Sequence, residues 1–362
     1  MSILYDEGQR EIADESRRIL EARISTEALL PLLETRDGIF DPFWSIAKEQ
    51  GWTAVALPEE YGGLGLGLVE LGLVALQAGR SLSGAPFLTA SFGAARAILD
   101  HGDAATKERW LPRLASGDVI GAVAFAEEQE VIGRGVSFSG GYLIGTKSSV
   151  IGGTRAGLAV VTASDKGVPV LVLAEVSGVE RNIVESFDNS RCAADLVFSS
   201  TPATELARGA AAEAAALHIL ALQAVVTAHE QTGGAEKLLE TARDYALTRR
   251  AFGQPIAAFQ SVKHRIAEMY ALVELARAGA VHAASREGEP DFVLAAAAAR
   301  IQATDSYDTA ARDCVQIHGG IGVTWEAGLH LHMRRARSLA IEQGNLFFWE
   351  DVLVDRLQGT TA

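Results

Sequence analysis

The residues best suited to chemistry lie in two short stretches in the second half of the sequence, Tyr245–Ile256 and Gln316–Glu326. Arg249 follows a helical stretch and precedes Phe252-Gly253, a pair that breaks regular structure. The planar guanidinium of an arginine placed there can form two parallel hydrogen bonds with a pyrophosphate. The ring of Phe252 can lie against another ring system. We therefore expect this stretch to bind a phosphorylated ligand that carries rings.

Two glutamines and a glycine pair extend this group of candidate binding residues. Gln260 follows the Arg249 stretch, and Gln316 precedes Gly319 and Gly320 further along the chain. A glutamine side chain offers both a donor and an acceptor to the polar edge of a ligand. The paired glycines lack a Cβ, so a ligand can approach the backbone closely there. The alternative, which concerns the fold alone, is a helix C-cap at Arg249 and a simple turn at the glycine pair.

Three segments of different character must position these residues. Residues 1–115 have apolar positions at helical spacing, which predicts an N-terminal helical domain. Residues 116–204 consist of short apolar or alternating runs between Gly, Asp, Asn and Ser, which is typical of an antiparallel β domain. Residues 205–362 return to helical spacing and predict a C-terminal four-helix bundle. The predicted fold class is α+β and mostly α, and the long helices of the bundle are expected over 210–232, 235–250, 260–285 and 290–314.

The composition restricts the classes of partner and the cell compartment. The chain has 32 basic and 46 acidic residues and a net charge of −14, which disfavours nucleic acid and anionic membrane surfaces as partners. The N-terminus has no basic region followed by an apolar one, and no stretch reaches the roughly 20 apolar residues expected of a membrane span. Cys192 and Cys314 make no disulfide framework and fit a reducing compartment. We expect a cytoplasmic protein without a nucleic-acid or membrane partner.

Four histidines raise the question of a metal site: His264, His318, His330 and His332. No cysteine or carboxylate completes the usual zinc spacing around them. His330 and His332 fall in a stretch with helical character, where side chains two residues apart diverge. We therefore expect structural or surface roles for these histidines and no metal site.

Three ordered motifs give the chain a resemblance to a known family. They are Pro58-Glu-Glu-Tyr-Gly-Gly-Leu-Gly65, Tyr245-Ala-Leu-Thr-Arg-Arg-Ala-Phe-Gly-Gln-Pro-Ile256 and Gln316-Ile-His-Gly-Gly-Ile-Gly-Val-Thr-Trp-Glu326. In this order, on a helical, β, helical framework, they resemble the acyl-CoA dehydrogenases over nearly the whole chain. The resemblance implies that the candidate binding residues reach across a subunit interface to the diphosphate and adenosine of flavin adenine dinucleotide (FAD) in a neighbouring subunit. These residues are Arg249, Phe252, Gln260, Gln316, Gly319 and Gly320.

The chain departs from the family pattern at both positions where the family carries its carboxylate base. The family reaction removes a proton from C2 of an acyl thioester and passes hydride from C3 to the flavin, so the base must sit in a dry pocket. The resemblance places the base either shortly after the run Arg334-Arg-Ala-Arg337 or on the first long helix of the bundle. Those positions carry Gln343 and Gln223. Glutamine has the shape of glutamate but no basic oxygen that can take a proton.

Three carboxylates are candidates for a substitute base. Glu230 lies seven residues after Gln223, on nearly the same helical face and about 10 Å along the axis. The stretch Ala228–Ala235 resembles a bacterial subgroup of the family that has glutamate at this point. Glu342 adjoins the C-terminal glutamine but points about 100° away on a helix, and Glu326 falls in a predicted loop. Glu230 is the candidate base, and a solvated carboxylate is the alternative for each of the three.

The positions that contact the flavin ring in the family also differ. Family members usually carry Thr-Glu-Pro followed by small hydroxyl residues, where this chain has Ala126-Glu-Glu-Gln-Glu130. The next strand of the family offers Trp-Ile-Thr after Gly-x-Lys, where this chain has Gly145-Thr-Lys-Ser-Ser-Val-Ile151. Ser149 and Ile151 thus replace the tryptophan and the threonine. The resemblance implies that hydrogen bonds to the ring and the thioester are lost at Ala126 and Ile151.

These departures favour one function over two alternatives. The leading hypothesis is the smaller subunit of a heteromeric (α2β2) acyl-CoA dehydrogenase of the kind associated with bacterial steroid side-chain breakdown. This chain would complete the FAD site of a second acyl-CoA dehydrogenase-like subunit, which supplies the base for α,β-desaturation of an acyl-CoA substrate. The family's usual electron acceptor is an electron-transferring flavoprotein. The alternatives are a self-sufficient homo-oligomeric acyl-CoA dehydrogenase that uses Glu230, and a non-catalytic binding or scaffold protein of the same fold.

Overall fold

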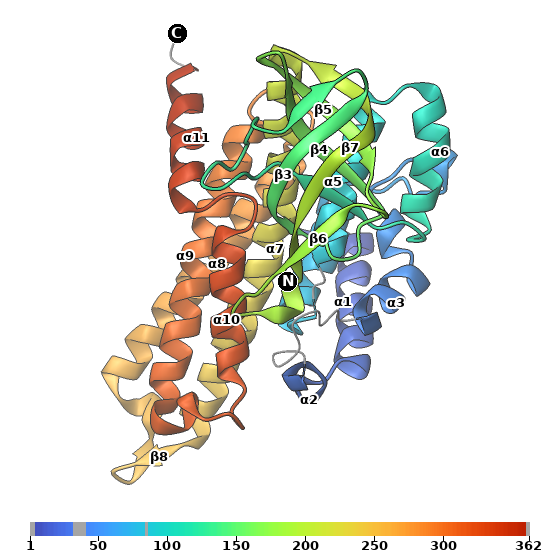
Figure 1. Ribbon diagram of the computed structural model, residues 1–362. Coiled ribbons are helices and arrows are strands. Elements are labelled where there is room, and N and C mark those ends of the chain that lie inside the picture. Colours follow the sequence, from blue (N-terminus) through green and yellow to red (C-terminus); the bar gives the residue numbers. More distant parts are fainter. Residues whose placement is uncertain (1–3, 32–40, 84–85, 360–362) are drawn as a thin grey trace. The chain divides into compact units, whose positions relative to one another are not determined.

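In the computed structural model the chain forms helices, then strands, then helices again (Figure 1). The structure describes residues 4–31, 41–83 and 86–359. The chain divides into two units, each built from separate stretches. Unit 1 consists of Met1–Ala28, Gly72–Gly84 and Ala224–Ala362, and unit 2 consists of Leu29–Leu71 and Ala85–Gln223. The predicted boundaries at 115/116 and 204/205 stay predictions.

The helices of the N-terminal part begin where the sequence supplies caps. At the start of α1, the Asp6 carboxylate accepts the N–H of Gln9 while the Gln9 side chain accepts the N–H of Asp6, which is a capping box. At the start of α6, Asp103 accepts the N–H of Thr106. The helices are α1 (Glu7–Arg23), α2 (Thr26–Leu29), α3 (Asp41–Glu49), α4 (Leu68–Arg80), α5 (Pro86–His101) and α6 (Ala104–Ala115), with short 3-10 helices η2 (Trp52–Ala54) and η3 (Glu59–Tyr61).

Unit 2 contains a seven-stranded sheet that closes on itself. The strand order is β1-β4-β2-β3-β7-β5, β6 pairs with β7, and β5 pairs with β4 as well as with β7, which completes a ring. Most pairings are antiparallel, as predicted, but β1–β4 and β2–β4 are parallel. The strands are β1 (Gly121–Ala124), β2 (Ser137–Ser139), β3 (Tyr142–Ile151), β4 (Leu158–Asp165), β5 (Val168–Glu175), β6 (Glu180–Val184) and β7 (Ala193–Arg208), and η4 (Asn189–Arg191) precedes β7.

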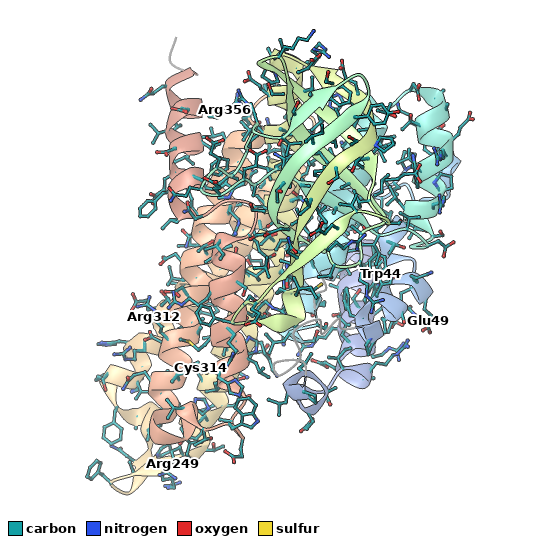
Figure 2. All side chains as sticks on the ribbon, viewed as in Figure 1. Trp44, Glu49, Arg249, Arg312, Cys314 and Arg356 are labelled. Carbon is teal, nitrogen blue, oxygen red and sulfur yellow. The ribbon has the colours of Figure 1, made fainter. Side chains whose placement is uncertain are left out.

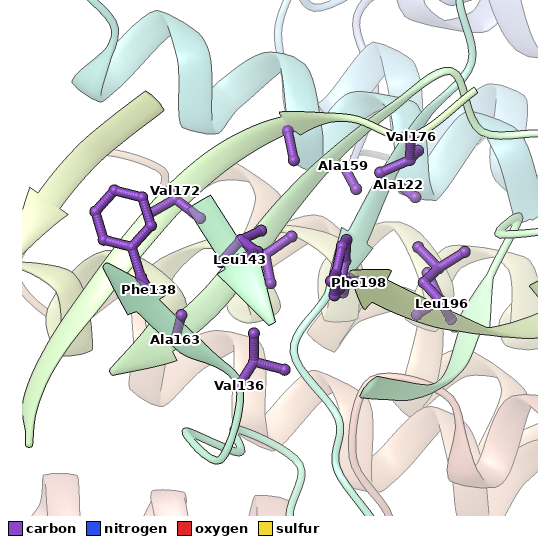
Figure 3. Packing of buried hydrophobic residues seen from close by; sticks show 14 of the residues in the cluster. Ala122, Val136, Phe138, Leu143, Ala159, Ala163, Val172, Val176, Leu196 and Phe198 are labelled. Atoms are coloured by element: carbon purple, nitrogen blue, oxygen red, sulfur yellow. The ribbon is translucent and has the colours of Figure 1, made fainter. Parts of the chain in front are cut away.

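The interior of this sheet is filled by apolar side chains (Figure 3). Leu143 of β3, Val172 of β5 and Leu196 of β7 are fully buried, and Phe198 is nearly so. Side chains alternate between the two faces of a strand, so one residue in two along β3 and β7 points into this core. The closed sheet is therefore a packed core for unit 2.

The longest helix corrects one prediction. α7 (Ala210–Thr248) is continuous through Gly233 and Gly234, where the sequence predicts a break between two helices. A Cβ on Gly233 would lie 1.8 Å from the carbonyl oxygen of Leu76, and a Cβ on Gly234 would lie 2.4 Å from the Tyr307 ring. The glycines therefore permit α4 and α9 to pack closely on α7 rather than ending the helix.

Unit 1 contains the helical bundle, and the predicted fold class is confirmed. Its core joins α7, α8 and α9 through buried residues such as Ala242, Met269 and Tyr307. A two-strand hairpin and a short 3-10 helix connect α7 to α8, and a second 3-10 helix follows α9. The elements are β8 (Arg250–Ala251), β9 (Gln254–Pro255), η5 (Ile256–Ala258), α8 (Gln260–Ser285), α9 (Phe292–His318), η6 (Gly319–Val323), α10 (Leu329–Ile341) and α11 (Leu346–Gly359).

One helix among the described residues has the length and composition of a membrane span. It is α7, and 67% of its most apolar window is buried inside the structure. The expectation that no stretch is long and apolar enough for a membrane span was therefore wrong. Burial of this extent is typical of the core helix of a helical bundle.

Candidate functional site

The hairpin after α7 presents an aromatic side chain to solvent at a strained backbone position. Both central residues have positive φ, 49° at Phe252 and 83° at Gly253, as in a type I′ hairpin turn. Glycine adopts this backbone freely, whereas a bulky residue there costs about 1–3 kcal/mol. The Phe252 side chain is 97% exposed, and its ring lies edge-on to the Phe259 ring with centroids 6.3 Å apart. Burial within this chain does not compensate the strain, so we infer that Phe252 contacts another molecule.

Arg249 stands at the base of the same hairpin with its side chain exposed (Figure 2). Its N–H donates to the Tyr245 carbonyl at 2.8 Å, and its carbonyl accepts the N–H of Ile256 at 2.8 Å. Both bonds use the backbone, and the guanidinium has no hydrogen bond or ion pair in the described part of the chain. The neighbouring Arg250 instead donates to the Gly253 carbonyl at 3.4 Å. Arg249 is therefore available to an outside anion, while Arg250 supports the hairpin.

The C-terminal end of α9 lies against the C-terminal end of α7. The His318 ring stacks on the Tyr245 ring with centroids 4.0 Å apart, and the Tyr245 hydroxyl donates to the His318 carbonyl at 3.5 Å. The helix ends at Gly319, where φ is 59° and the N–H donates to the Gln316 carbonyl. A Cβ on Gly319 or Gly320 would meet open space. Both glycines thus leave the backbone accessible to a ligand.

The structure brings the predicted cofactor-binding residues to one end of unit 1. Three come from the connection between α7 and α8 and the first residue of α8, and three come from the end of α9 and the start of η6. Together they offer a cation, two amides, an aromatic face and open backbone, which fits a diphosphate joined to adenosine. All six are exposed in this chain, so a group bound there needs a second surface to bury it. The six are Arg249, Phe252, Gln260, Gln316, Gly319 and Gly320.

Three apolar side chains beside the glycine pair were missed by the sequence reading. Ile321, Val323 and Trp325 are 48%, 75% and 46% exposed. The Trp325 ring stacks on His330 with centroids 4.4 Å apart, which fixes its orientation. The signal in the sequence is an apolar residue at every second position after Gly320. Exposed apolar side chains that gather in one place are typical of an interaction surface.

One of the two positions where the resemblance places the base is already engaged within unit 1. Gln343 lies in the turn between α10 and α11 with φ of 54°. Its Oε1 accepts a hydrogen bond from the Thr227 hydroxyl at 3.1 Å, and Thr227 is fully buried on α7. The amide oxygen can accept this bond but cannot take up a proton. The pair holds the turn against α7.

A buried arginine, also missed by the sequence reading, fixes the same turn. Arg300 of α9 is 1% exposed and donates to the Glu342 carbonyl at 2.9 Å, to the Leu339 carbonyl, and to the Gln231 side chain at 2.6 Å. These oxygens accept hydrogen bonds from Nη1 and Nη2, so the turn between α10 and α11 is tied to α7 and α9 together. The available sequence signal is a single arginine that directly follows the alanine run Ala295–Ala299 on a helix.

The other position where the resemblance places the base lies in unit 2 and is buried. Gln223 is 2% exposed, and its Nε2 donates to the Thr89 carbonyl at 3.4 Å. Gly93 of α5 packs directly on it, because a Cβ there would lie 3.0 Å from the Gln223 amide. The Oε1 is buried without a hydrogen-bond partner among the described residues. An amide in this setting offers an acceptor to the interior but no proton acceptor for catalysis.

Glu230, the candidate substitute base, is buried in an ion pair within unit 1. Its Oε1 lies 3.1 Å from Nη1 of Arg335, and the two side chains are 4% and 2% exposed. Nη2 of Arg335 donates to the Leu82 carbonyl at 3.0 Å. A Cβ on Gly79 would lie 1.9 Å from the Glu230 carbonyl oxygen, so α4 packs against the backbone of this residue. The Glu230 carboxylate is thus engaged in a buried ion pair within unit 1.

In unit 2, the segment after Ala126 is held by a buried lysine. Lys147 of β3 is fully buried and donates to the Gly133 carbonyl at 2.8 Å, to the Thr162 hydroxyl at 2.9 Å and to Glu127. Burial lowers the pKa of Lys147 to about 8, and the Glu127 carboxylate opposes that shift. These partners give the lysine a structural role. Ala126 itself contributes no polar side-chain atom to this region.

The strand that follows has a bulge at the second departure from the family pattern. The pairing of β3 with β7 shifts between Lys147 and Val150, and Ser149 has φ of 50°. Its N–H donates to Oδ1 of Asp195 at 2.8 Å, and the residue is exposed. Ile151 ends the strand with an apolar side chain. Neither Ala126 nor Ile151 can hydrogen-bond a flavin ring through its side chain.

Comparison with known proteins gives consistent results along the chain. Residues 6–118 match the acyl-CoA dehydrogenase N-terminal domain, and residues 213–346 match the acyl-CoA dehydrogenase C-terminal domain. Acyl-CoA dehydrogenase IpdE2 of Mycobacterium tuberculosis is 31% identical over 310 residues, which cover 84% of this chain and 82% of that protein.

Solved structures are similar over nearly the whole chain. A Tcur3481-Tcur3483 steroid acyl-CoA dehydrogenase variant is 26% identical with a TM-score of 0.87, covering 98% of this chain and 99% of that one. A glutaryl-CoA dehydrogenase from Mycobacterium smegmatis, solved in complex with FADH2, has a TM-score of 0.86 at 22% identity, covering 99% and 96%. The second likeness concerns the fold alone.

Proposed function

Because this chain belongs to the acyl-CoA dehydrogenase family, we propose that it completes the FAD site of an unlike partner subunit in a heteromeric acyl-CoA dehydrogenase. The partner would supply the carboxylate base and the contacts to the flavin ring. The observation that carries the proposal is a contrast within this chain. Arg249 and Phe252 are exposed to solvent. By contrast, the two positions where the family carries its carboxylate base hold Gln223 and Gln343, which have no basic oxygen.

The proposed role of this chain is to bind and shield the cofactor rather than to move protons. Arg249 would pair with the diphosphate, Phe252 would cover the adenosine, and Gln316 would hydrogen-bond its polar edge. The open backbone at Gly319 would permit close approach. FAD, when bound, supplies the acceptor for the hydride that leaves C3 of the acyl thioester. The exposed apolar side chains of Ile321, Val323 and Trp325 would exclude water from the interface between the two chains.

The relatives support a heteromer and suggest a substrate class. One similar solved structure is that of the steroid acyl-CoA dehydrogenase Tcur3481-Tcur3483, whose name joins two proteins. By analogy, we propose a second acyl-CoA dehydrogenase-like chain as partner and a steroid-derived acyl-CoA thioester as substrate. An electron-transferring flavoprotein as acceptor and a cytoplasmic location stay predictions.

The proposal is tested by flavin stoichiometry. This chain is purified alone and after co-expression with a candidate acyl-CoA dehydrogenase-like partner chain, and FAD is quantified per heterodimer. We expect one FAD per heterodimer and none with this chain alone. Arg249→Ala should lower FAD affinity by at least about tenfold, because it removes a charge-assisted pair. Arg243→Ala is the matched control and should retain the cofactor, since Arg243 is an exposed arginine of α7 that pairs with Asp244 within the chain.

A chain that is fully loaded with FAD and active when purified alone would contradict the proposal. That result would favour the self-sufficient enzyme with Glu230 as base. Glu230→Gln, which keeps the shape and one hydrogen-bond acceptor for Arg335, would then abolish turnover. If neither the chain alone nor any co-expressed pair shows flavin absorbance, the result would instead favour a non-catalytic binding or scaffold protein of the same fold.

A further inference from the structure

His318 lies between two residues of the proposed cofactor contact, Gln316 and Gly319, yet its ring packs on α7. The ring stacks on the Tyr245 ring with centroids 4.0 Å apart and planes inclined by 22°. Nδ1 of His318 lies 2.8 Å from the carbonyl oxygen of Cys314, one turn earlier on α9. A carbonyl oxygen only accepts hydrogen bonds, so Nδ1 carries the proton. This bond fixes the orientation of the imidazole on its own helix.

Tyr245, on the other side of the stack, is fixed on α7. Its side chain packs against the apolar core of unit 1. Its carbonyl oxygen accepts the N–H of Arg249 at 2.8 Å, and its hydroxyl donates to the His318 carbonyl at 3.5 Å. A hydrogen bond of that second length is weak, so the ring stack is the main contact between the two residues. The two rings therefore connect Arg249 to Gly319 through a short series of contacts.

Three separate helix ends carry the candidate binding residues, and helix ends open locally unless other contacts hold them. Arg249 follows α7, Gln260 begins α8, and Gly319 follows the last residue of α9. The ring stack holds the first of these ends to the third. Arg265 and Asp313 form an ion pair that holds α8 to α9. The side chain of Arg265 is 46% exposed, so this ion pair should contribute less than the stack.

We propose that His318 is a positioning residue for the cofactor, and that its stack on Tyr245 fixes the separation between Arg249 and the open backbone at Gly319. This role rests on the proposed function, in which one FAD molecule contacts both places. The diphosphate and the adenosine are joined covalently, so the groups that bind them must be held at a matching separation.

The stack holds the two helix ends in place before FAD binds. Without it, the cofactor would have to order both ends on binding, and that cost lowers affinity. An aromatic pair contributes a modest free energy beyond the area that it buries. Loss of the His318 ring should therefore weaken FAD binding by about three- to tenfold, which is less than the effect expected for loss of the Arg249 guanidinium.

Hydrogen exchange of this chain alone tests the contact without flavin. His318→Ala removes the ring and should speed exchange of the backbone amides of residues 250–254 and 319–323 by at least about threefold, because the two helix ends open more often. His318→Phe keeps a ring at this position and should exchange like the wild type. Equal exchange in His318→Ala and the wild type would overturn the role of the stack.

A variant that loses stability elsewhere in the bundle is the matched control. Val281 is 8% exposed on α8, about 31 Å along the helix axis from Gln260. Val281→Ala removes buried methyl groups and should destabilise unit 1, but the stack stays intact. The same amides should therefore exchange as in the wild type. Faster exchange to the same extent as in His318→Ala would show a general loss of stability and would overturn the proposal.

Titration of the heterodimer with FAD tests the effect on the cofactor. His318→Ala should weaken FAD binding by about three- to tenfold, and His318→Phe should return it to within about twofold of the wild type. Val281→Ala should bind FAD like the wild type. Unchanged affinity in His318→Ala, or an equal loss in Val281→Ala, would overturn the proposal. A wild-type heterodimer without FAD would instead contradict the proposed function, and the exchange measurement would still decide whether the stack holds the two helix ends.

Discussion

The exposed end of unit 1 and the interior of the same unit use polar residues in opposite ways. In the interior, Glu230 is matched by Arg335, and Gln343 is matched by the Thr227 hydroxyl. At the exposed end, Arg249 has no side-chain partner in the described chain. Groups that are satisfied inside the chain stabilise the fold, whereas unsatisfied groups on a rigid support are available to another molecule.

The two regions also show that the type of a residue does not by itself decide its role. Glu230 has the chemistry of a base and a plausible place on α7, yet its charge is committed to Arg335. Phe252 has no reactive group, yet its strained and exposed position is hard to explain without a binding partner. Substitutions in the interior should therefore change stability, while substitutions at the exposed end should change cofactor binding.

The largest effect is expected at the buried ion pair. Glu230→Ala leaves Arg335 buried without its counter-ion and should lower the free energy of unfolding by about 3–5 kcal/mol. Urea denaturation measures the change. Glu326→Ala removes an exposed carboxylate and should stay within about 0.5 kcal/mol of the wild type. Similar values for the two variants would remove the distinction between the two regions.

The next effect depends on pH. Burial lowers the pKa of His229, the residue before Glu230, to about 4, whereas the unfolded value is about 6.5. The unfolded state therefore binds the proton first, and the free energy of unfolding should fall by up to about 3 kcal/mol as the pH decreases from about 6.5 to about 4. His229→Leu should lessen this fall. His332, whose pKa burial lowers to about 3, should preserve a remaining part of it.

A smaller effect is expected at the close contact between α7 and α4. Gly233→Ala would place a Cβ 1.8 Å from the Leu76 carbonyl oxygen and should destabilise unit 1 by about 1–3 kcal/mol. Gly279→Ala in α8 is the matched control, because the nearest atom to its Cβ would be 3.8 Å away. That variant should be neutral or slightly stabilising, since alanine is the better helix former. Thermal unfolding of both variants would decide whether close packing explains the glycines of α7.

The smallest change in stability is expected at the exposed end. Arg249→Ala should leave the free energy of unfolding within about 0.5 kcal/mol, because the guanidinium makes no hydrogen bond or ion pair in the described part of the chain. The same variant should show the loss of FAD from the heterodimer described above. If the free energy of unfolding fell as far as in Glu230→Ala, Arg249 would belong with the structural residues.

The fold class could be predicted because the spacing of apolar residues along the sequence indicates which faces of the helices and strands are buried. The helical and alternating patterns indicate which segments are helices and which are strands, and the structure agrees with that order. The predicted break at Gly233 was wrong because local propensity cannot register that Leu76 approaches this glycine from another helix. The bulge at Ser149 was also beyond prediction, since it depends on the register between β3 and β7.

The amino-acid sequence by itself determined what each position can do chemically. The amide side chains at 223 and 343 cannot act as bases, and the apolar side chains at 126 and 151 cannot hydrogen-bond a ring, whatever the fold. Only the tertiary structure decided which groups are engaged within the chain. Arg335 and Glu230 are far apart in sequence and meet because α10 packs on α7, which no local pattern specifies. The same packing leaves Arg249 and Phe252 exposed, because they lie beyond the end of the helix that buries the rest.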